Sequence, residues 1–313
     1  MANSNLVSII IPLFNEEDSL AILIKKLIKS TKSIDSKFEF IFVNDGSTDK
    51  SLNIIKKLNQ KNFKIISLVR NLGQTAAIMA GIDNCKGEII VMMDADGQND
   101  PSDIPKLLDM IKNGGFDVVS GWRYKRNDGF FRVFFSKIAN KLLSFILNLK
   151  LHDYGCTLKA YKRDIIKNIK LYGEMHRLIP FYAKLEGAKI GEVKVNHFAR
   201  RFGKSKYGMS RIFKVLLDVI LLVFFRRFIN KPIYFFGGVG LIFFFFSCLT
   251  LIYTLKLKYV DGISFILTPL PILIIFFFIT SIMSLFFGII SEILSRTYHE
   301  SQSKKSYKIK SID

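Results

Sequence analysis

Two long stretches near the C-terminus carry no charged residue, and they limit what this chain can fold into. Pro232–Leu255 spans 24 residues and Gly262–Ser291 spans 30 residues. At ~1.5 Å of rise per residue, a helix of either length crosses the ~30 Å hydrocarbon core of a bilayer. Apolar runs such as Ile242–Phe246 are also rare in the helices of soluble cores. We therefore predict two transmembrane helices joined by a short loop, with both chain ends on the same side of the membrane.

The charges around these stretches predict their orientation. Cations flank the two outer ends, whereas the connecting loop has only Lys256 and Lys258 against Asp261. By the positive-inside rule, the rest of the chain and both termini are cytoplasmic, in a two-span protein of the cytoplasmic (inner) membrane. The flanking cations are Arg226, Arg227, Lys231, Arg296, Lys304, Lys305, Lys308 and Lys310.

The net charge of the whole chain is +20, from 46 Lys+Arg against 26 Asp+Glu, and it implies an anionic partner. Anionic lipid headgroups account for much of it, because many of the basic residues lie beside membrane segments. The same placement, with no aromatic groove, disfavours nucleic acid as a partner. The three cysteines, Cys85, Cys156 and Cys248, have no metal-binding or disulfide spacing, so a reducing compartment is expected.

Residues 1–121 alternate between short apolar runs and segments with helical spacing. This alternation predicts an α/β fold with a Rossmann-like, mostly parallel sheet and helices on both faces. The predicted strands are Leu6–Pro12, Phe38–Val43, Lys64–Leu68, Glu88–Asp94 and Asp117–Gly121. The predicted helices are Glu16–Lys29, Thr48–Asn59, Thr75–Asn84 and Ile104–Asn113.

Each of the five predicted strands is followed by a polar loop, and in a parallel sheet these loops meet at one edge. Ligands bind in such sheets beyond the carboxyl ends of the strands, so the sequence predicts a substrate cleft there. No Gly-x-Gly-x-x-Gly follows the first strand and no Gly-x-x-x-x-Gly-Lys is present, which disfavours a dinucleotide site and a P-loop. The five loops are 12–17, 44–49, 70–74, 94–98 and 121–126.

The fourth loop carries the strongest chemical signal. Asp94 and Asp96 are two residues apart at the end of a buried strand, so they project to the same side of an extended backbone, and Gln98 adds a further oxygen. Oxygen ligands of this kind suit Mg²⁺ or Mn²⁺, which commonly bridges carboxylates and substrate phosphates. The alternative is a polar turn, since Asp-Gly and Asn-Asp-Pro form turns.

Two further segments, Phe130–Leu149 and Arg211–Phe228, show an amphipathic pattern. Each is either a helix packed on the sheet or a helix lying in the membrane interface with its cations at the headgroups, and the nearby spans favour the interface. The predicted organisation is a cytoplasmic domain over 1–230, two spans over 231–292 and a basic cytoplasmic tail over 293–313.

Seven motifs in order resemble family 2 glycosyltransferases, and specifically their polyprenyl-phosphate branch of dolichol-phosphate mannose synthases and undecaprenyl-phosphate sugar transferases. The resemblance covers roughly residues 6–230, and the paired C-terminal spans fit it. It implies a nucleotide-sugar domain of the GT-A type. The motifs are Val7–Glu17, Val43–Asp49, Arg70–Gly81, Asp94–Gln98, Asp153–Cys156, Gly173–Pro180 and Arg200–Tyr207.

The resemblance also implies roles for individual residues. A nucleotide pocket would be lined by Pro12, Asn15, Glu16, Asn44, Asp45 and Arg70. Asp94, Asp96 and Gln98 would hold a divalent ion on the diphosphate, with Arg200 and Lys206 closing over the phosphates. Arg123, Arg132 and Ser136 would meet the acceptor phosphate. The sequence leaves open whether Asp153 and the 173–177 segment line the site.

The implied reaction is an inverting, metal-dependent transfer of a sugar from a nucleotide-diphosphate sugar to a polyprenyl phosphate. A UDP-sugar is favoured over GDP-mannose. Asn44 stands where relatives usually have an aspartate, and this lost charge leaves the selectivity for the base open. One alternative is a processive polysaccharide synthase, but its Gln-x-x-Arg-Trp motif is missing and Trp122 is the only tryptophan. The other is a non-catalytic membrane-anchored protein that binds nucleotide-sugars. The sugar and the oligomeric state, a homo-oligomer included, stay open.

Overall fold

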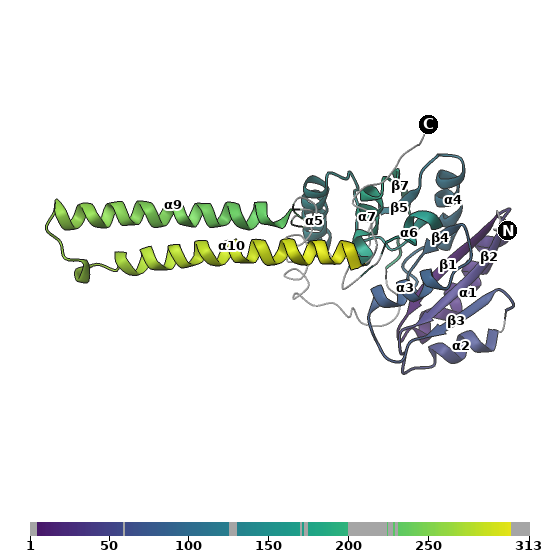
Figure 1. Ribbon diagram of the computed structural model, residues 1–313. Coiled ribbons are helices and arrows are strands. Elements are labelled where there is room, and N and C mark those ends of the chain that lie inside the picture. The colour runs from purple at the N-terminus through teal and green to yellow at the C-terminus, as the bar shows by residue number, and fades with distance from the viewer. Residues whose placement is uncertain are drawn as a thin grey trace, which may run out of the picture. The chain divides into compact units, whose positions relative to one another are not determined.

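The computed structural model describes residues 5–58, 60–124, 130–169, 171, 175–199, 224, 228 and 231–301 (Figure 1). These residues fall into two compact units, one within 1–214 and the other within 215–313.

The first unit is built on a seven-stranded sheet with the order β3-β2-β1-β4-β6-β5-β7. Strands β3, β2, β1 and β4 are parallel to one another. Strand β6 runs antiparallel to both β4 and β5, and β7 is parallel to β5. The first five strands are therefore mutually parallel, which confirms the predicted mostly parallel sheet. The strands are β1 Leu6–Leu13, β2 Lys37–Asn44, β3 Phe63–Ser67, β4 Ile89–Met92, β5 Val118–Arg123, β6 Lys159–Lys162 and β7 Ile190–Val195.

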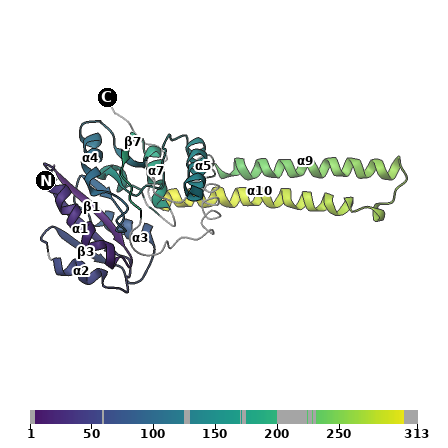
Figure 2. The same cartoon turned by 180° about the vertical axis from the view of Figure 1, so that it is seen from behind.

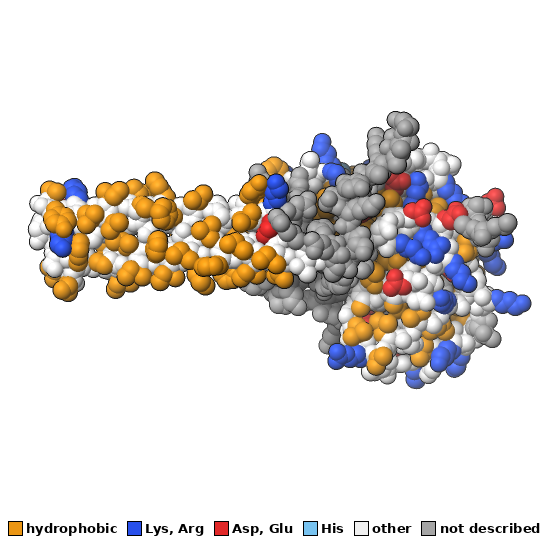
Figure 3. Space-filling model, viewed as in Figure 1, with side chains coloured by type: hydrophobic (Ala, Val, Ile, Leu, Met, Phe, Trp, Pro, Cys, Tyr) orange, Lys and Arg blue, Asp and Glu red, His pale blue; other side chains and the backbone are white. Residues whose placement is uncertain are grey.

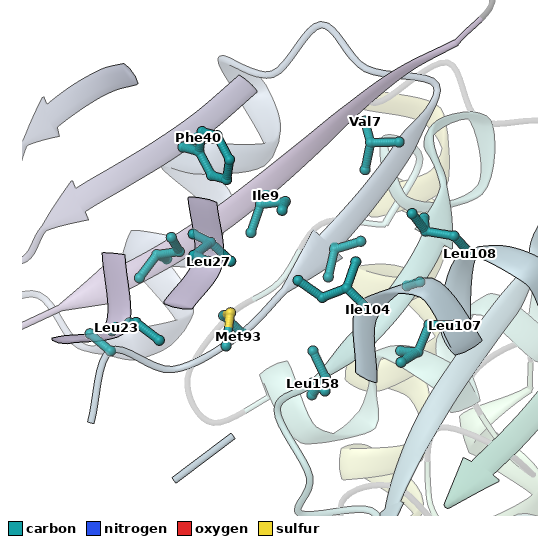
Figure 4. Packing of buried hydrophobic residues seen from close by; sticks show 14 of the residues in the cluster. Val7, Ile9, Leu23, Leu27, Phe40, Met93, Ile104, Leu107, Leu108 and Leu158 are labelled. Atoms are coloured by element: carbon teal, nitrogen blue, oxygen red, sulfur yellow. The ribbon is translucent and has the colours of Figure 1, made fainter. Parts of the chain in front are cut away.

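Helices cover both faces of this sheet because side chains alternate sides along every strand. Leu23 and Leu27 of α1 pack on Ile9 and Phe40 of one face, beside Ile104 of α4 (Figure 4). The opposite face packs against α3, α6 and α7. The helices of this unit are α1 Glu17–Lys32, α2 Ser51–Leu58, α3 Gln74–Asp83, α4 Ile104–Lys112, α5 Phe130–Leu147, α6 Arg163–Ile166 and α7 Ile179–Leu185, with short 3-10 helices at Pro101–Asp103 and Met175–Leu178.

Helix α5 corresponds to the first predicted amphipathic segment. Leu143 and Leu147 are buried on one side, whereas Phe145 is 85% exposed. The polar row of the helix joins it to the following loop, since Ser144 Oγ donates a hydrogen bond to the Leu151 carbonyl at 2.8 Å. One face therefore packs on the unit and another presents apolar side chains outward. The second predicted amphipathic segment, 211–228, lies outside the described residues except for 224 and 228.

The second unit is a hairpin of two antiparallel helices, α9 Pro232–Tyr259 and α10 Leu270–Ser301 (Figures 1 and 2). Both are long and apolar enough to cross a membrane. Their outward side chains are largely hydrophobic (Figure 3). Small residues lie where the helices meet: Ser247 Oγ donates to the Ile274 carbonyl at 3.1 Å and Ser284 Oγ to the Phe236 carbonyl at 2.7 Å. Such residues let membrane helices approach closely.

The connection between the two spans differs from the prediction. Lys256 and Lys258 lie in the last turn of α9 rather than in the loop, and α10 begins at Leu270 rather than near Gly262. The loop extends to Pro269, which disfavours helical backbone at the residue just before it. It contains one 3-10 turn, Phe265–Leu267.

Candidate active site

Asp94 lies just beyond the carboxyl end of β4, where neutral donors hold both of its oxygens. Gln74 Nε2 donates to Oδ1 at 2.6 Å and Thr157 Oγ1 donates to Oδ2 at 2.8 Å. Burial, reinforced by the nearby charge of Asp96, raises the pKa of Asp94 to about 7. The ionised pair is therefore poorly compensated by the protein, and a cation bound between the two carboxylates would stabilise it.

The residues present fit a divalent ion whose remaining ligands come from a substrate. Gly97 adopts a φ of 72°, and the turn brings the Gln98 backbone N–H to Asp96 Oδ1 at 3.1 Å. Within the described residues no group of three or more His, Cys, Asp or Glu forms a metal cage. Two carboxylates completed by water and phosphate oxygens are typical of Mg²⁺ sites. Metal binding by Asp94, Asp96 and the Gln98 side chain stays a prediction.

The loop after β2 is fixed to the loop after β3. Asp45 is buried, and its two oxygens accept the backbone N–H groups of Leu72 at 2.7 Å and Gly73 at 3.0 Å. Asn44 is also buried and accepts the Ser47 N–H through Oδ1 at 3.0 Å. Asp45 and Asn44 therefore shape the walls of the predicted nucleotide pocket, and their contact with a nucleotide stays a prediction.

The loop after β1 is joined to the same place. Asn15 has a positive φ of 52°, and its Oδ1 accepts the Thr48 N–H at 2.8 Å. The next residue, Glu16, donates its backbone N–H to Ser51 Oγ at 2.9 Å. Asn15, Glu16, Asn44 and Asp45 therefore lie on loops that are joined by hydrogen bonds between side chains and backbone groups, although the loops are far apart in sequence. Arg70 is exposed on the third loop.

Asp153, whose place in the site the sequence left open, forms an ion pair with Arg123. The carboxylate is buried and forms a bidentate ion pair, with Nε to Oδ2 at 2.6 Å and Nη2 to Oδ1 at 2.9 Å. Gly155 donates its N–H to Asp153 Oδ1 at 3.1 Å, and a Cβ at Gly155 would lie 3.1 Å from Arg123 Nη2. The Asp153–Gly155 turn therefore holds the guanidinium of Arg123 in one orientation. A flexible, exposed arginine would not be held in this way.

The structure describes only some of the other residues that were predicted to bind the acceptor or close over the diphosphate. The backbone of α5 carries Arg132 and Ser136 one turn apart, and Ser136 is half-buried. The Arg132 side chain, Arg200 and Lys206 lie outside what the structure describes. Their roles stay predictions.

A small cavity of about 20 Å³, open to solvent at its mouth, is lined by Asp94 and by residues of α3 and the 175–178 turn. Pro12, Gln74, Asp94 and Thr157 line the part nearest the acid pair. The deeper lining includes Lys159 and Tyr161 of β6, which sequence reasoning missed. It also includes His176 and Arg177 of the 173–177 segment, whose place the sequence left open. No sequence signal marked β6, because its four residues begin and end with lysine, and burial of Lys159 depends on pairing with β4 and β5.

Comparisons with known proteins agree with this geometry. The chain is 39% identical over 312 residues to a dodecaprenyl-phosphate galacturonate synthase of Rhizobium johnstonii, covering 98% of this chain and 92% of the relative. It is 31% identical over 310 residues to an undecaprenyl-phosphate 4-deoxy-4-formamido-L-arabinose transferase of Edwardsiella ictaluri, covering 98% and 94%.

Solved structures show the same fold. Glucosyl-3-phosphoglycerate synthase of Mycobacterium tuberculosis, with Mn²⁺, UDP and its product, superposes with a TM-score of 0.55 at 20% identity, covering 71% of this chain and 80% of that one. The family model for Glycosyl transferase family 2 matches residues 8–170. The chain therefore belongs to glycosyl transferase family 2 and is a glycosyltransferase with a GT-A-like fold.

Proposed function

We propose that this enzyme transfers one sugar from a nucleotide-diphosphate sugar to a polyprenyl phosphate at the membrane. The observation that carries the proposal is the extent of the similarity. The matches to two relatives named for polyprenyl-phosphate acceptors cover 98% of this chain, so they include the α9–α10 hairpin as well as the sheet. The names differ in the sugar, which leaves the donor open.

The donor side of the reaction needs negative charge to be neutralised as the bond to the leaving diphosphate breaks. A divalent ion, Mg²⁺ or Mn²⁺, would supply that neutralisation when bound at Asp94 and Asp96. Gln74 and Thr157 hold Asp94 in place before any ligand arrives, so little reorganisation is needed. Structural neighbours were crystallised with UDP and either Mn²⁺ or Mg²⁺, which supports a divalent ion and favours a UDP-sugar.

The acceptor side needs positive charge and little base catalysis, because a lipid phosphate is already an anion near neutral pH. Arg123, which forms an ion pair with Asp153, is proposed to meet that phosphate. Arg132 and Ser136 on α5 are proposed to extend the same basic path. Direct attack by a phosphate oxygen on the anomeric carbon, with departure of the nucleotide diphosphate from the opposite side, inverts the anomeric centre. Arg200 and Lys206 are proposed to close over the diphosphate.

The two apolar helices are compatible with membrane anchoring. We further propose that the enzyme is a two-span protein of the cytoplasmic membrane, with a catalytic domain over 1–230, spans over 231–292 and a cytoplasmic tail over 293–313. Cations before α9 and after α10 support cytoplasmic termini.

A donor and acceptor screen tests the proposal. Detergent-purified full-length protein would be incubated with a polyprenyl phosphate and UDP- or GDP-sugars, with Mg²⁺, with Mn²⁺ or with chelator. We expect metal-dependent nucleotide release together with a new glycolipid, both lost in Asp96→Asn. Nucleotide release without glycolipid would reject the lipid acceptor, and nucleotide binding without any turnover would indicate the non-catalytic binding protein.

A further inference from the structure

Asn99 belongs to the Asn-Asp-Pro turn after the acid pair, but its side chain reaches back toward Asp94. The link is Thr157, whose hydroxyl lies 2.8 Å from Asn99 Nδ2 and 2.8 Å from Asp94 Oδ2. Asp94 and Asn99 lie on either side of Asp96 and the Gly97 turn, so the loop that carries the acid pair closes on one side chain. That side chain comes from a distant part of the chain, the segment just before β6.

The three groups form a relay of hydrogen bonds that has only one direction. The amide nitrogen of Asn99 can only donate, so the Thr157 oxygen accepts from it. A hydroxyl has a single proton and an ionised carboxylate can only accept, so this proton is directed at Asp94 Oδ2. Asn99 therefore keeps the Thr157 hydroxyl in the orientation that donates to Asp94.

The amide at the start of the relay has a fixed position. Asn99 is almost wholly buried and forms a β-bridge with His197, and next to this bridge the Phe198 N–H donates to the Gln98 carbonyl at 2.9 Å. On the other side of Asn99, the carboxylate of Asp100 caps the 3-10 helix that follows. Both neighbours of Asn99 are thus tied to other segments, and its side chain is held before any ligand binds.

We infer that Asn99 is a positioning residue that acts through Thr157 and holds the Asp94 carboxylate in the orientation that binds the divalent ion. The inference rests on the proposed function, because the ion on the donor diphosphate is what gives Asp94 its role. Hydrogen bonds from outer groups commonly orient the carboxylates that bind a metal. Each carboxylate oxygen has two acceptor sites, so the bonds from Gln74 and Thr157 leave one on each oxygen for a cation.

Removing the hydroxyl in the middle of the relay is the first test. Thr157→Val nearly keeps the shape of the side chain and leaves Asp94 Oδ2 without its donor. Calorimetry of UDP binding, and separately of GDP binding, at increasing Mn²⁺ concentrations gives the apparent Kd for the ion on detergent-purified full-length protein. We expect this Kd to rise roughly 10- to 100-fold in Thr157→Val, the usual effect of losing a partner of a metal ligand. Thr157→Ser keeps the hydroxyl and should restore most of the affinity.

Asn99→Leu tests the relay without changing the group that touches Asp94, and it serves in place of Thr157→Val if that variant does not fold. It removes the donor that orients the hydroxyl, so the Kd for Mn²⁺ should rise roughly 3- to 10-fold, the range of about one neutral hydrogen bond. The double variant Asn99→Leu/Thr157→Val should bind Mn²⁺ no more weakly than Thr157→Val alone, because Asn99 acts through Thr157. Additive losses in the double variant would overturn the relay.

Thr31→Val is the matched control for loss of a buried threonine hydroxyl. Thr31 is buried in the last turn of α1, where its hydroxyl donates to the Leu27 carbonyl at 2.9 Å. Helix α1 begins at Glu17, beside the site, so Thr31 lies about 20 Å further along the helix at ~1.5 Å per residue. Thr31→Val should lower the melting temperature and leave the Kd for Mn²⁺ unchanged.

Turnover assays add a readout that a general loss of stability would not produce. Thr157→Val should raise the Mn²⁺ concentration that gives the half-maximal rate. It should leave the KM for polyprenyl phosphate unchanged, because Arg123 has its own partner in Asp153.

The outcomes separate the inference from the proposed function. Wild-type Mn²⁺ affinity in Thr157→Val, or an equal loss in Thr157→Val and Thr31→Val, would overturn the inference. Either result leaves the proposed function standing, since the unaltered protein still binds the ion with a nucleotide. Unaltered protein that binds neither UDP nor GDP in a Mn²⁺-dependent way would instead reject the metal-dependent donor site of the proposed function, and the inference with it.

Discussion

The ion pair between Arg123 and Asp153 gives the sharpest test of how the site is held together. The two side chains are 15% and 3% exposed, and they share two short hydrogen bonds. Asp153→Ala would leave a mostly buried guanidinium without its carboxylate. Removing one partner of a buried ion pair typically costs about 3–5 kcal/mol, mainly because the remaining charge is uncompensated.

This cost translates into a measurable melting shift. The unit that contains the pair lies within residues 1–214, and for a domain of this size 1 kcal/mol corresponds to about 2–4 °C. Asp153→Ala should therefore lower the melting temperature of the purified protein by roughly 6–20 °C. The double variant Arg123→Met/Asp153→Ala should recover part of that loss, because it leaves no buried charge behind.

Two results would refute this reasoning. A shift below about 3 °C in Asp153→Ala would show that the buried carboxylate contributes little to stability. A double variant less stable than Asp153→Ala would show that Arg123 is stabilised mainly by other contacts. Asp164→Ala is a suitable control, since Asp164 is an acid of the same unit and forms no ion pair among the described residues.

Further predictions concern the loops and the acid pair. Gly46→Ala should lower the free energy of unfolding by about 2–4 kcal/mol in a thermal melt, because Gly46 has a φ of +69° and a Cβ there would lie 2.6 Å from backbone atoms. Gly115→Ala is the control: Gly115 has the same φ but open space around it, so the variant should lose only about 1–2 kcal/mol. The pKa of Asp94 is raised from 3.8 to about 7, so the stabilisation from its protonation is complete below pH 3.8 and is lost as the pH rises through 7. The melting temperature of metal-free protein should therefore fall between about pH 4 and 7, and Asp94→Asn should flatten that slope. In initial-rate assays at varied polyprenyl phosphate, Asp96→Asn should lower turnover at least ~100-fold, whereas Arg132→Ala should mainly raise the KM for the acceptor.

The order of strands and helices in the first 121 residues could be predicted because local patterns determine it. Every one of the five predicted strands is present, with ends that differ by no more than two residues. The acid pair was also recognisable, since two carboxylates directly after an apolar strand have no role in a core. These features depend on neighbours in sequence, which is why periodicity and composition were sufficient.

Features that depend on tertiary pairing could not be predicted. Strand β6 is inserted antiparallel between β4 and β5, and its sequence, Lys-Ala-Tyr-Lys, resembles an exposed loop. Asp153 precedes Tyr-Gly, a turn pattern that says nothing about a guanidinium thirty residues earlier. Lys159 is buried only because β6 has neighbours on both sides. Each of these residues has its role through a partner distant in sequence.

Three carboxylates at this edge of the sheet have three different sets of partners, and the difference favours Asp94 as the predicted cation ligand. Asp45 accepts two backbone N–H groups, and Asp153 accepts a guanidinium. Asp94 accepts hydrogen bonds from the neutral donors Gln74 and Thr157, and the nearby negative charge of Asp96 affects it more than the positive charge of Arg123. Of the three, Asp94 is the carboxylate whose charge the protein compensates least, although the chain as a whole carries +20. This arrangement is the reason that we propose a divalent ion, bound to the diphosphate of the substrate, as the partner of Asp94.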